Sequence, residues 1–369
     1  MKVSQEILNL IPYQPGKPIE ETQREYGLSK VYKLASNENP LGPSPMAQAA
    51  MTQSIKDLHR YPDGSSFQLK KVIAEKYAVA PEKVTFGNGS NELIDLLVRV
   101  FAEPGERILT SVSAFIAYEL CAQAARVQIE KISLNAEMGY DIPAFIERLT
   151  SREKQMPRMI FIANPNNPTG SYINTEELTS LLEATKDIQD FLVVLDEAYN
   201  EFVRAEDYPN SIEMQKKYPH LVVLRTLSKV YGIAGLRIGW MLAEPELIDL
   251  VNRVRNPFNV NSLAQVGAAA ALKDVDFLQR SQQVNWQGLD YFYKELERLQ
   301  LKYWPSQGNF VLFDTGHDSS AVYERLLQKG VIMRPVKGYG LMTHLRLSVG
   351  LPEENQMAMS ALEEVLRSI

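Results

Sequence analysis

Several short segments in the middle of the chain are apolar almost throughout, and helical patterns separate them from one another. Clear examples are RMIFIAN at 158–164, FLVVLDEAY at 191–199 and LVVLRTLS at 221–228. A strand that is apolar on both faces has to be covered on both faces, and this is the situation in parallel sheets flanked by helices. The sequence therefore predicts an α/β fold built on a mostly parallel sheet covered by helices.

The pattern changes towards both ends of the chain. Residues 1–45 are rich in Pro, Gly, Asn and Glu, so we expect an extended arm with turns that also forms part of a small domain. Residues 46–265 hold the alternating strand and helix patterns of a large domain. In residues 266–369 a long helical stretch precedes three strand patterns and a closing helix, which indicates a smaller α+β domain.

Composition argues against several classes of protein. The 369 residues have a formal net charge of −6, which is unfavourable for nucleic-acid binding. No run approaches the ~18 apolar residues of a membrane span, and the apolar run near the N-terminus is too short for a signal peptide. The single cysteine, Cys121, suits a reducing compartment. We therefore expect a cytoplasmic protein without a membrane or nucleic-acid partner.

Four polar clusters follow predicted strands. GNGSNE follows the strand VTF, NPNNPTG follows the strand that ends at Ala163, Asp196 ends FLVVLD, and Lys229 follows LVVLRTLS. In open parallel sheets, ligands bind at the carboxyl ends of the strands. We therefore expect the four clusters to converge on one cleft.

Lys229 and Arg237 are the first pair that indicates a particular chemistry. Alone, a lysine after a strand is most often a surface residue. A lysine acts as a nucleophile when its amine is neutral, and its best-known product is a Schiff base with a carbonyl. The guanidinium of Arg237 is a fixed cation with a fork of donors suited to phosphate. A Schiff base beside a phosphate points to pyridoxal 5'-phosphate as cofactor.

This cofactor makes further demands, and the other clusters can meet them. Its pyridine nitrogen needs a buried carboxylate as partner, a role that fits Asp196. Its phosphate needs backbone N–H groups such as those at the start of a helix. Singly, these residues have ordinary structural explanations in turns, caps or core. The remaining candidates for the ring oxygen, the phosphate and the ring face are Asn167 and Tyr199, then Gly89, Ser90, Asn91, Thr226 and Ser228, and finally Phe115.

Two rival kinds of site are weaker. An apolar run followed by Asp-Glu also occurs in ATPases, but these need G-x-x-x-x-G-K-[ST]. The Gly16-Lys17 pair of this chain is followed by Pro18 and lies in the arm. The four histidines show neither H-E-x-x-H nor close pairing, so no metal site is expected.

The motifs in this order resemble the fold-type I pyridoxal-phosphate aminotransferases. They are NNPTG at 166–170, DEAY at 196–199 and TLSK…GLRIG at 226–239, and the likeness spans nearly the whole chain. The resemblance implies a large cofactor-binding domain and a small domain. It also implies that Lys229 bonds to the cofactor, that Asp196 partners the pyridine nitrogen and that Arg237 binds the phosphate. Arg346 in HLRLSVG would clamp a substrate carboxylate.

Narrower features resemble the histidinol-phosphate aminotransferase family. They are PYQPGKP, KLASNENPLGPSP, RYPDGSS, RTLSK and RNPFNVNSLAQ. The resemblance implies transamination of L-histidinol phosphate with 2-oxoglutarate, giving imidazole acetol phosphate and glutamate in histidine biosynthesis. It implies a homodimer in which Tyr61 reaches the cofactor phosphate of the neighbouring subunit. The residues it implies around the substrate are Tyr13, Asn39, Asn261 and Arg334.

Other activities remain open at this stage. An aromatic or broad-range amino-acid aminotransferase would use the same site, because a flat hydrophobic pocket discriminates weakly between similar rings. A decarboxylase on the same fold would share Lys229 and Asp196. A non-catalytic regulator would need an added binding region, and residues 1–45 show no helix-turn-helix pattern. In the aminotransferase, Lys229 would move a proton from the substrate α-carbon to the cofactor.

Overall fold

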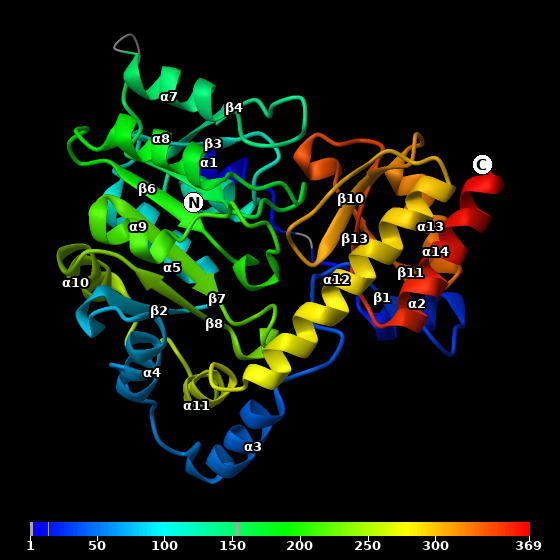
Figure 1. Cartoon of the computed structure of the whole chain (residues 1–369), viewed down its shortest axis with the longest axis horizontal. Helices are drawn as coiled ribbons and strands as arrows, with labels where there is room; N and C mark the ends of the chain where they lie inside the picture. Colours follow the sequence, from blue (N-terminus) through cyan, green and yellow to red (C-terminus); the bar gives the residue numbers. More distant parts are fainter. Residues whose placement is uncertain (1–2, 14, 152–154) are drawn as a thin grey trace.

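The structure is a computed structural model that describes residues 3–13, 15–151 and 155–369. A larger body with a central sheet and a smaller body lie side by side, and the long helix α12 (Val275–Arg298) runs between them (Figure 1). The middle of the chain, with its alternating strands and helices, forms the larger body, and the last third of the chain belongs to the smaller body.

The larger body is built on seven strands that form a mostly parallel sheet. Their order is β2 (Val84–Asn88), β8 (Ile238–Leu242), β7 (Leu221–Thr226), β6 (Leu192–Asp196), β5 (Met159–Ala163), β3 (Arg107–Ser111) and β4 (Gln128–Ile132). The strands from β7 to β4 are parallel to their neighbours. Strand β8 is antiparallel to both β2 and β7. The predicted α/β fold is confirmed.

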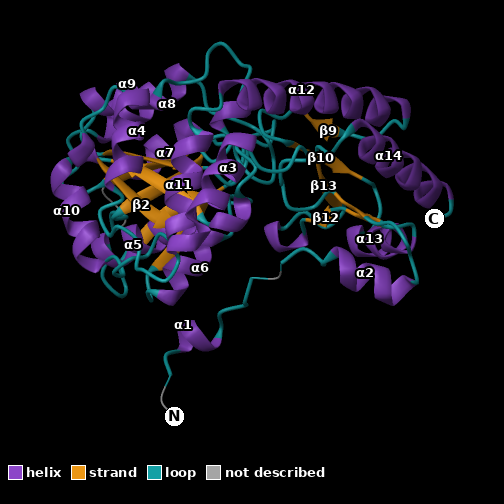
Figure 2. Cartoon of the chain, turned by 90° about the horizontal axis from the view of Figure 1, so that it is seen from below, coloured by secondary structure: helices purple, strands orange, loops and turns teal. Residues whose placement is uncertain are grey.

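Helices cover both faces of this sheet (Figure 2). One face packs against α4 (Phe67–Tyr77), α7 (Ile142–Thr150), α8 (Thr175–Thr185), α9 (Ser211–Lys217) and α11 (Ser262–Ala271). The other face packs against α5 (Ser90–Phe101), α6 (Ala117–Ala124) and α10 (Pro245–Val254). Helix α3 (Pro45–Ser54) lies against α11.

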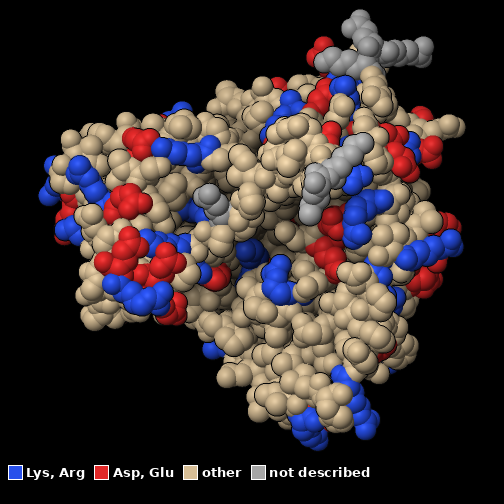
Figure 3. Space-filling model, turned by 180° about the vertical axis from the view of Figure 1, so that it is seen from behind, with Lys and Arg blue, Asp and Glu red and all other residues tan. Residues whose placement is uncertain are grey.

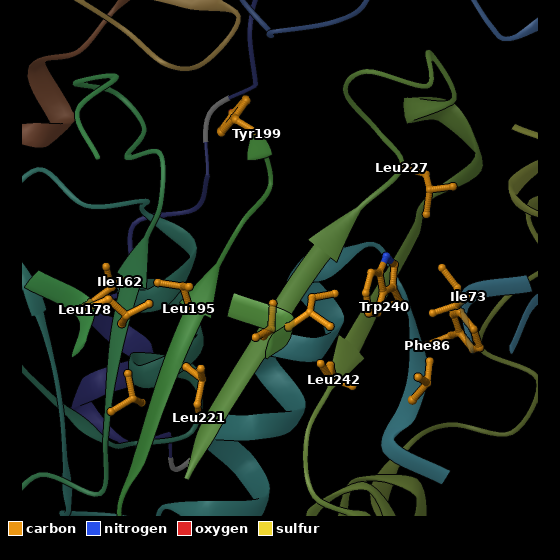
Figure 4. Packing of buried hydrophobic residues seen from close by; sticks show 14 of the residues in the cluster. Ile73, Phe86, Ile162, Leu178, Leu195, Tyr199, Leu221, Leu227, Trp240 and Leu242 are labelled. Carbon is orange, nitrogen blue, oxygen red and sulfur yellow. The ribbon is translucent and has the colours of Figure 1, made fainter. Parts of the chain in front are cut away.

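Each central strand contributes apolar side chains to both cores. Val193 and Leu195 belong to the first core, whereas Val194 between them belongs to the second. Figure 4 shows part of the first core, in which Leu195 and Leu221 come from adjacent strands and Tyr199 lies beyond the end of β6. Side chains alternate across a strand, so a strand buried on both faces has to be apolar at every position. This is why the middle of the sequence reads as continuous apolar runs.

The smaller body holds an antiparallel sheet and takes in the start of the chain. Its strands are ordered β12 (Arg334–Pro335), β13 (His344–Ser348), β10 (Phe310–Asp314) and β9 (Tyr303–Trp304), and its helices include α13 (Ser319–Gln328) and α14 (Pro352–Arg367). Strand β1 (Tyr32–Lys33) pairs in parallel with β11 (Val331–Ile332). The segment after the arm is thereby joined to the last third of the chain.

The first 45 residues are more regular than expected. They contain the short helix α1 (Gln5–Leu8) and the helix α2 (Ile19–Tyr26), in which Thr22 is buried. The expectation of an extended arm with turns is therefore wrong at Ile19–Tyr26, which form a helix. Two acidic residues in its first turn and a C-cap glycine, Gly27 at φ 67°, are helix signals that the surrounding prolines obscured.

The surface shows charges of both signs mixed together. On the face in Figure 3, acidic and basic side chains are interspersed, and Lys or Arg atoms are visible at a hollow near the middle. Among the described helices, none combines the length and the apolar character that crossing a membrane requires.

Candidate active site

The carboxyl ends of the central strands open into one cavity of about 170 Å³. The four polar clusters that follow strands in the sequence all contribute side chains to it. The N-terminal segment and β13 of the smaller body contribute the rest, so the cavity lies between the two bodies. Its lining residues are Tyr13, Ser36, Asn37, Ser90, Asn91, Phe115, Ala163, Pro165, Asn167, Asp196, Ala198, Tyr199, Thr226, Ser228, Lys229, Arg237 and Arg346.

Lys229 presents its amine to this cavity from the turn after β7. Its Nζ lies 3.3 Å from the backbone oxygen of Ser36 and 5.6 Å from the ring centroid of Tyr199. Burial, together with the nearby guanidinium of Arg346, lowers the pKa of Lys229 to about 8. The amine is therefore much closer to its neutral, nucleophilic form at neutral pH than an exposed lysine is.

Asp196 is buried at the end of β6 and has one oxygen without a partner. Its Oδ2 accepts a hydrogen bond of 3.0 Å from the hydroxyl of Tyr118. Its Oδ1 is buried and has no hydrogen-bond partner in the described part of the chain. Burial raises the pKa of Asp196 to about 6, against the lowering effect of the Tyr118 hydrogen bond. A buried carboxylate oxygen of this kind fits a cationic N–H donor.

Asn167 and Tyr199 both line the cavity, and each accepts a hydrogen bond from another lining residue. The Oδ1 of Asn167 accepts a hydrogen bond of 2.5 Å from Nη1 of Arg346. The hydroxyl of Tyr199 accepts a hydrogen bond of 2.9 Å from Nδ2 of Asn37. Because a phenol has one hydrogen of its own, Tyr199 keeps a donor for a ligand oxygen.

The start of α5 forms the anion-binding end of the cavity. Gly89 precedes the helix at φ 79°, and a side chain there would bring its Cβ within 2.5 Å of the Arg237 guanidinium. The Oγ1 of Thr226 donates to the Oγ of Ser228 at 2.9 Å. A helix N-terminus, an arginine and hydroxyl groups are together suited to a phosphate.

Arg346 is buried and holds two of its donors within the chain. Its Nη1 donates to Asn167 and its Nη2 donates to the backbone oxygen of Ala35, both at 2.5 Å. Its Nε is buried and has no partner among the described residues. These two bonds do not use the Nε–H or the second hydrogen of each terminal nitrogen, so the guanidinium keeps donors for a ligand on this side of the cavity.

Tyr13 and Arg334 come together at the mouth of the cavity. The guanidinium carbon of Arg334 lies 5.7 Å from the ring centroid of Tyr13, which lines the cavity. Arg334 itself lines an adjoining cavity of about 650 Å³ rather than the central one. The predicted substrate roles of both residues stay predictions.

Three predicted site residues lie away from the central cavity of a single chain. Asn39 donates through Nδ2 to the backbone of Val230 at 2.7 Å, and Asn261 accepts from the backbone N–H of Ala264 at 2.8 Å as a helix cap. Both side chains therefore have structural roles. Tyr61 is 84% exposed in the single chain, and its role at the site of a neighbouring subunit stays a prediction.

Three polar residues at the site, besides the apolar lining residues Ala163, Pro165 and Ala198, were not identified from the sequence. Tyr118 bonds to Asp196, whereas Ser36 and Asn37 lie against Lys229 and Tyr199. Tyr118 follows Phe115 at helical spacing, which is the one available signal, but a buried aromatic residue in a helix is most often core. Ser36 and Asn37 belong to KLASNENPLGPSP, from which only Asn39 was predicted as a site residue, so this segment was the available signal for both.

Comparison with known proteins agrees with this geometry. The family model "Aminotransferase class I and II" matches residues 29–362. A histidinol-phosphate aminotransferase of Bdellovibrio bacteriovorus is 53% identical over 369 residues, which cover 100% of this chain and 99% of that protein. A histidinol-phosphate aminotransferase of an Anaeromyxobacter species is 47% identical over 361 residues, which cover 98% of each.

Solved structures share the whole fold. Histidinol-phosphate aminotransferase from Sinorhizobium meliloti in complex with pyridoxal-5'-phosphate has a TM-score of 0.88 at 26% identity, covering 100% of this chain and 98% of that one. Aspartate aminotransferase from Thermus thermophilus with maleate has a TM-score of 0.85 at 21% identity and 100% coverage of both chains, which supports the fold alone. The chain therefore belongs to the class I and II aminotransferases and, within them, to the histidinol-phosphate aminotransferase family.

Proposed function

We propose that this protein is a pyridoxal-phosphate-dependent enzyme that transfers the amino group of L-histidinol phosphate to 2-oxoglutarate. The products are imidazole acetol phosphate and glutamate, and the reaction belongs to histidine biosynthesis. Full-length identity of 53% to a relative named for this reaction supports the substrate. The observation that carries the chemistry is that Lys229 and a buried Asp196 with an unpartnered oxygen line the same cavity.

The residues around the cavity fit the cofactor. Asp196 Oδ1 lacks a partner in the part of the chain that the structure describes and matches a protonated ring nitrogen, and Gly89 leaves room for the Arg237 guanidinium beside the start of α5. When bound, pyridoxal phosphate supplies an aldehyde that takes up an amino group and a ring that draws electrons from the substrate α-carbon. The residues that would hold it are Ser90, Asn91, Thr226, Ser228 and Arg237 at the phosphate, with Asn167, Tyr199, Phe115 and Asp196 at the ring.

Lys229 is the residue that handles the proton. Its amine, with a pKa lowered to about 8, would accept a proton from the substrate α-carbon and would pass it to the cofactor, at the carbon that carried the aldehyde. A general base works best when its pKa lies near the operating pH, and burial brings Lys229 into that range. The negative charge of Asp196 would keep the ring nitrogen of the bound cofactor protonated, and this cationic nitrogen allows the ring to draw electrons from the α-carbon.

Arg346 is the residue that binds the anionic group of the substrates. Histidinol phosphate carries a phosphate but no carboxylate, whereas glutamate carries two carboxylates. A guanidinium can bind either anion through its fork of donors. The Nε of Arg346, which has no partner among the described residues, and the Arg334 guanidinium beside Tyr13 support the proposal that these two arginines serve both substrates in turn.

The wider organisation is part of the same proposal. We assign residues 1–45 to the arm and part of the small domain, 46–265 to the cofactor-binding domain and 266–369 to the small domain. The pairing of β1 with β11 supports the place of the N-terminal segment. A homodimer, with Tyr61 reaching the partner's site, and a cytoplasmic location remain predictions from the sequence.

The activity is tested by comparing substrates on the purified holoenzyme. We expect kcat/KM with 2-oxoglutarate as acceptor to be at least about a hundredfold higher for histidinol phosphate than for phenylalanine or tyrosine, because neither amino acid offers a phosphate to the arginines. Ratios near one would contradict the substrate and favour a broad-range aromatic aminotransferase.

A further inference from the structure

The two oxygens of Asp196 have different surroundings. The Oδ2 accepts a hydrogen bond of 3.0 Å from Tyr118, while the buried Oδ1 has no partner among the described residues. Asp196 lines the central cavity, and Tyr118 is not one of the lining residues. The tyrosine therefore holds the carboxylate from behind and leaves one oxygen for the cavity.

The ring of Tyr118 is fixed by its neighbours. The side chain is fully buried near the start of α6. Its ring stacks on Phe161 of β5 with centroids 4.8 Å apart and planes at 16°. Its edge meets the ring of Phe115 at 5.8 Å and 88°. Phe115 itself lines the cavity. The segment from Phe115 to Tyr118 therefore contributes both the hydrogen bond to Asp196 and the aromatic ring expected at the face of the cofactor.

We propose that Tyr118 is a positioning residue that fixes Asp196 through Oδ2, so that Oδ1 alone pairs with the ring nitrogen of the cofactor. This inference rests on the proposed function, since it concerns how the same cavity holds pyridoxal phosphate. Tyr118 acts through Asp196 and does not itself touch the cofactor or the substrate. A carboxylate held at a single orientation loses less conformational freedom on binding, and its charge stays in place during the reaction.

The charges around Asp196 give the hydrogen bond a measurable role. The titratable groups that face Asp196 are Tyr118, Tyr140, Tyr199, Glu197 and Lys229. Burial raises the pKa of Asp196, and the Tyr118 hydrogen bond opposes that rise. Burial, with the charge of Asp196, keeps the pKa of Tyr118 well above its ordinary value, so Tyr118 remains a donor. Without the hydroxyl, Asp196 would lose its charge at a higher pH.

The test is the variant Tyr118→Phe in the holoenzyme, which keeps both ring contacts and removes only the hydroxyl. We expect kcat to fall about tenfold while KM changes little, because the charged carboxylate loses a hydrogen bond that holds its orientation during the reaction. We expect the acid limb of the kcat profile to move up by about one pH unit. Equilibrium dialysis should show cofactor binding weakened by about tenfold. The pH titration of the visible absorption band of the bound cofactor should also shift.

A matched control removes a similar hydrogen bond elsewhere. The hydroxyl of Tyr172 donates to Asp207 at 2.7 Å, and Tyr172 does not line the cavity. Tyr172→Phe should leave kcat, the pH profile and the absorption band unchanged. The double variant Tyr118→Phe with Asp196→Asn should be no worse than Asp196→Asn alone, because Tyr118 acts through the carboxylate.

The outcomes separate this inference from the proposed function. A wild-type protein that binds pyridoxal phosphate and transaminates, with unchanged cofactor binding and titration in Tyr118→Phe, would overturn the positioning role only. Additive losses in the double variant would also overturn it. A wild-type protein without a cofactor absorption band would overturn the proposed function and this inference together.

Discussion

At position 196 the chain places a carboxylate in a buried site. The side chain is 3% exposed, and one of its oxygens has no partner among the described residues. Burying a charge without full compensation opposes folding, and here it raises the pKa of Asp196 to about 6. The same desolvation strengthens the attraction between Asp196 and a cationic ring nitrogen. We infer that the charge of Asp196 lowers the folding stability of the cofactor-free chain and strengthens cofactor binding.

Asp196→Asn should therefore stabilise the cofactor-free chain above pH 6 and not below pH 4. The ordinary aspartate pKa of 3.8 is raised to about 6 on folding, so its contribution is favourable below the lower value and is lost as pH rises through the higher one. A difference of roughly two pH units corresponds to ~3 kcal/mol. Urea unfolding of the wild-type chain and of Asp196→Asn at several pH values would measure the difference in the free energy of unfolding. An equal effect at pH 4 and pH 8 would contradict the assignment.

The site residues found from the sequence share one property. Lys229, Asp196, Asn167 and Tyr199 lie at the ends of strands or a few residues beyond them, so the rule for parallel sheets was sufficient to predict that they meet. Arg346 entered through the family resemblance, and the structure places it in the same cavity. Tyr118 was missed because its hydroxyl bonds to an acid that is distant in sequence, and its ring reads as ordinary core. Their roles toward the cofactor remain to be tested.

Among the elements, the central parallel strands were the most predictable. Both of their faces are buried, so β5, β6 and β7 are continuous apolar runs with little ambiguity. Strand β8 (Ile238–Leu242) was not predicted, because the glycine at 239 and the preceding Arg237 interrupt the apolar pattern. Its antiparallel pairing with β7 depends on the connection at residues 227–237 that carries Lys229, which no local pattern reveals.

A buried ion pair connects two of these strands beneath the cavity. Arg225 of β7 donates to Oε2 of Glu197, which follows Asp196, and the closest nitrogen–oxygen distance is 2.8 Å. The Arg225 guanidinium also lies 5.1 Å from the ring centroid of Tyr77. Buried pairs contribute little net stability but are costly to break, so this pair fixes the relative positions of the two strand ends. The sequence shows Arg225 only as a charge at the end of an apolar run.

At the scale of the whole molecule, the cavity belongs to both bodies. Lys229 and Asp196 come from the large sheet, Arg346 comes from β13, and Ser36 and Asn37 come from the N-terminal segment. The sequence indicated two bodies from the change of pattern after residue 265, but it held no information on how they pack. That Lys229 and Arg346 line the same cavity therefore follows from the tertiary structure alone.

The predicted dimer can be tested by complementation between inactive chains. Tyr61 is 84% exposed and stacks on Phe258 at 4.9 Å, so one chain gives its hydroxyl no cofactor to bind. If Tyr61 serves the partner's site, a mixture of Tyr61→Ala and Lys229→Ala chains should regain activity, because each mixed dimer has one intact site. After subunit exchange in equal amounts, about a quarter of wild-type activity is expected.

The control for this experiment is the two variants incubated separately. Each alone should have far less activity than the mixture. Sedimentation velocity over a dilution series should show the dimer in both variants. A fully active monomer, or a mixture no more active than the average of its parts, would contradict the cross-subunit role of Tyr61.

The central claim is that the amine of Lys229 bonds covalently to pyridoxal phosphate beside Asp196. Borohydride reduction of the holoenzyme makes the carbon–nitrogen bond permanent, and peptide mass spectrometry then locates it. We predict a single modified lysine at position 229 in the wild-type protein and no modified lysine in Lys229→Ala. A pyridoxyl group on another lysine, or an unmodified Lys229 in active enzyme, would contradict the account.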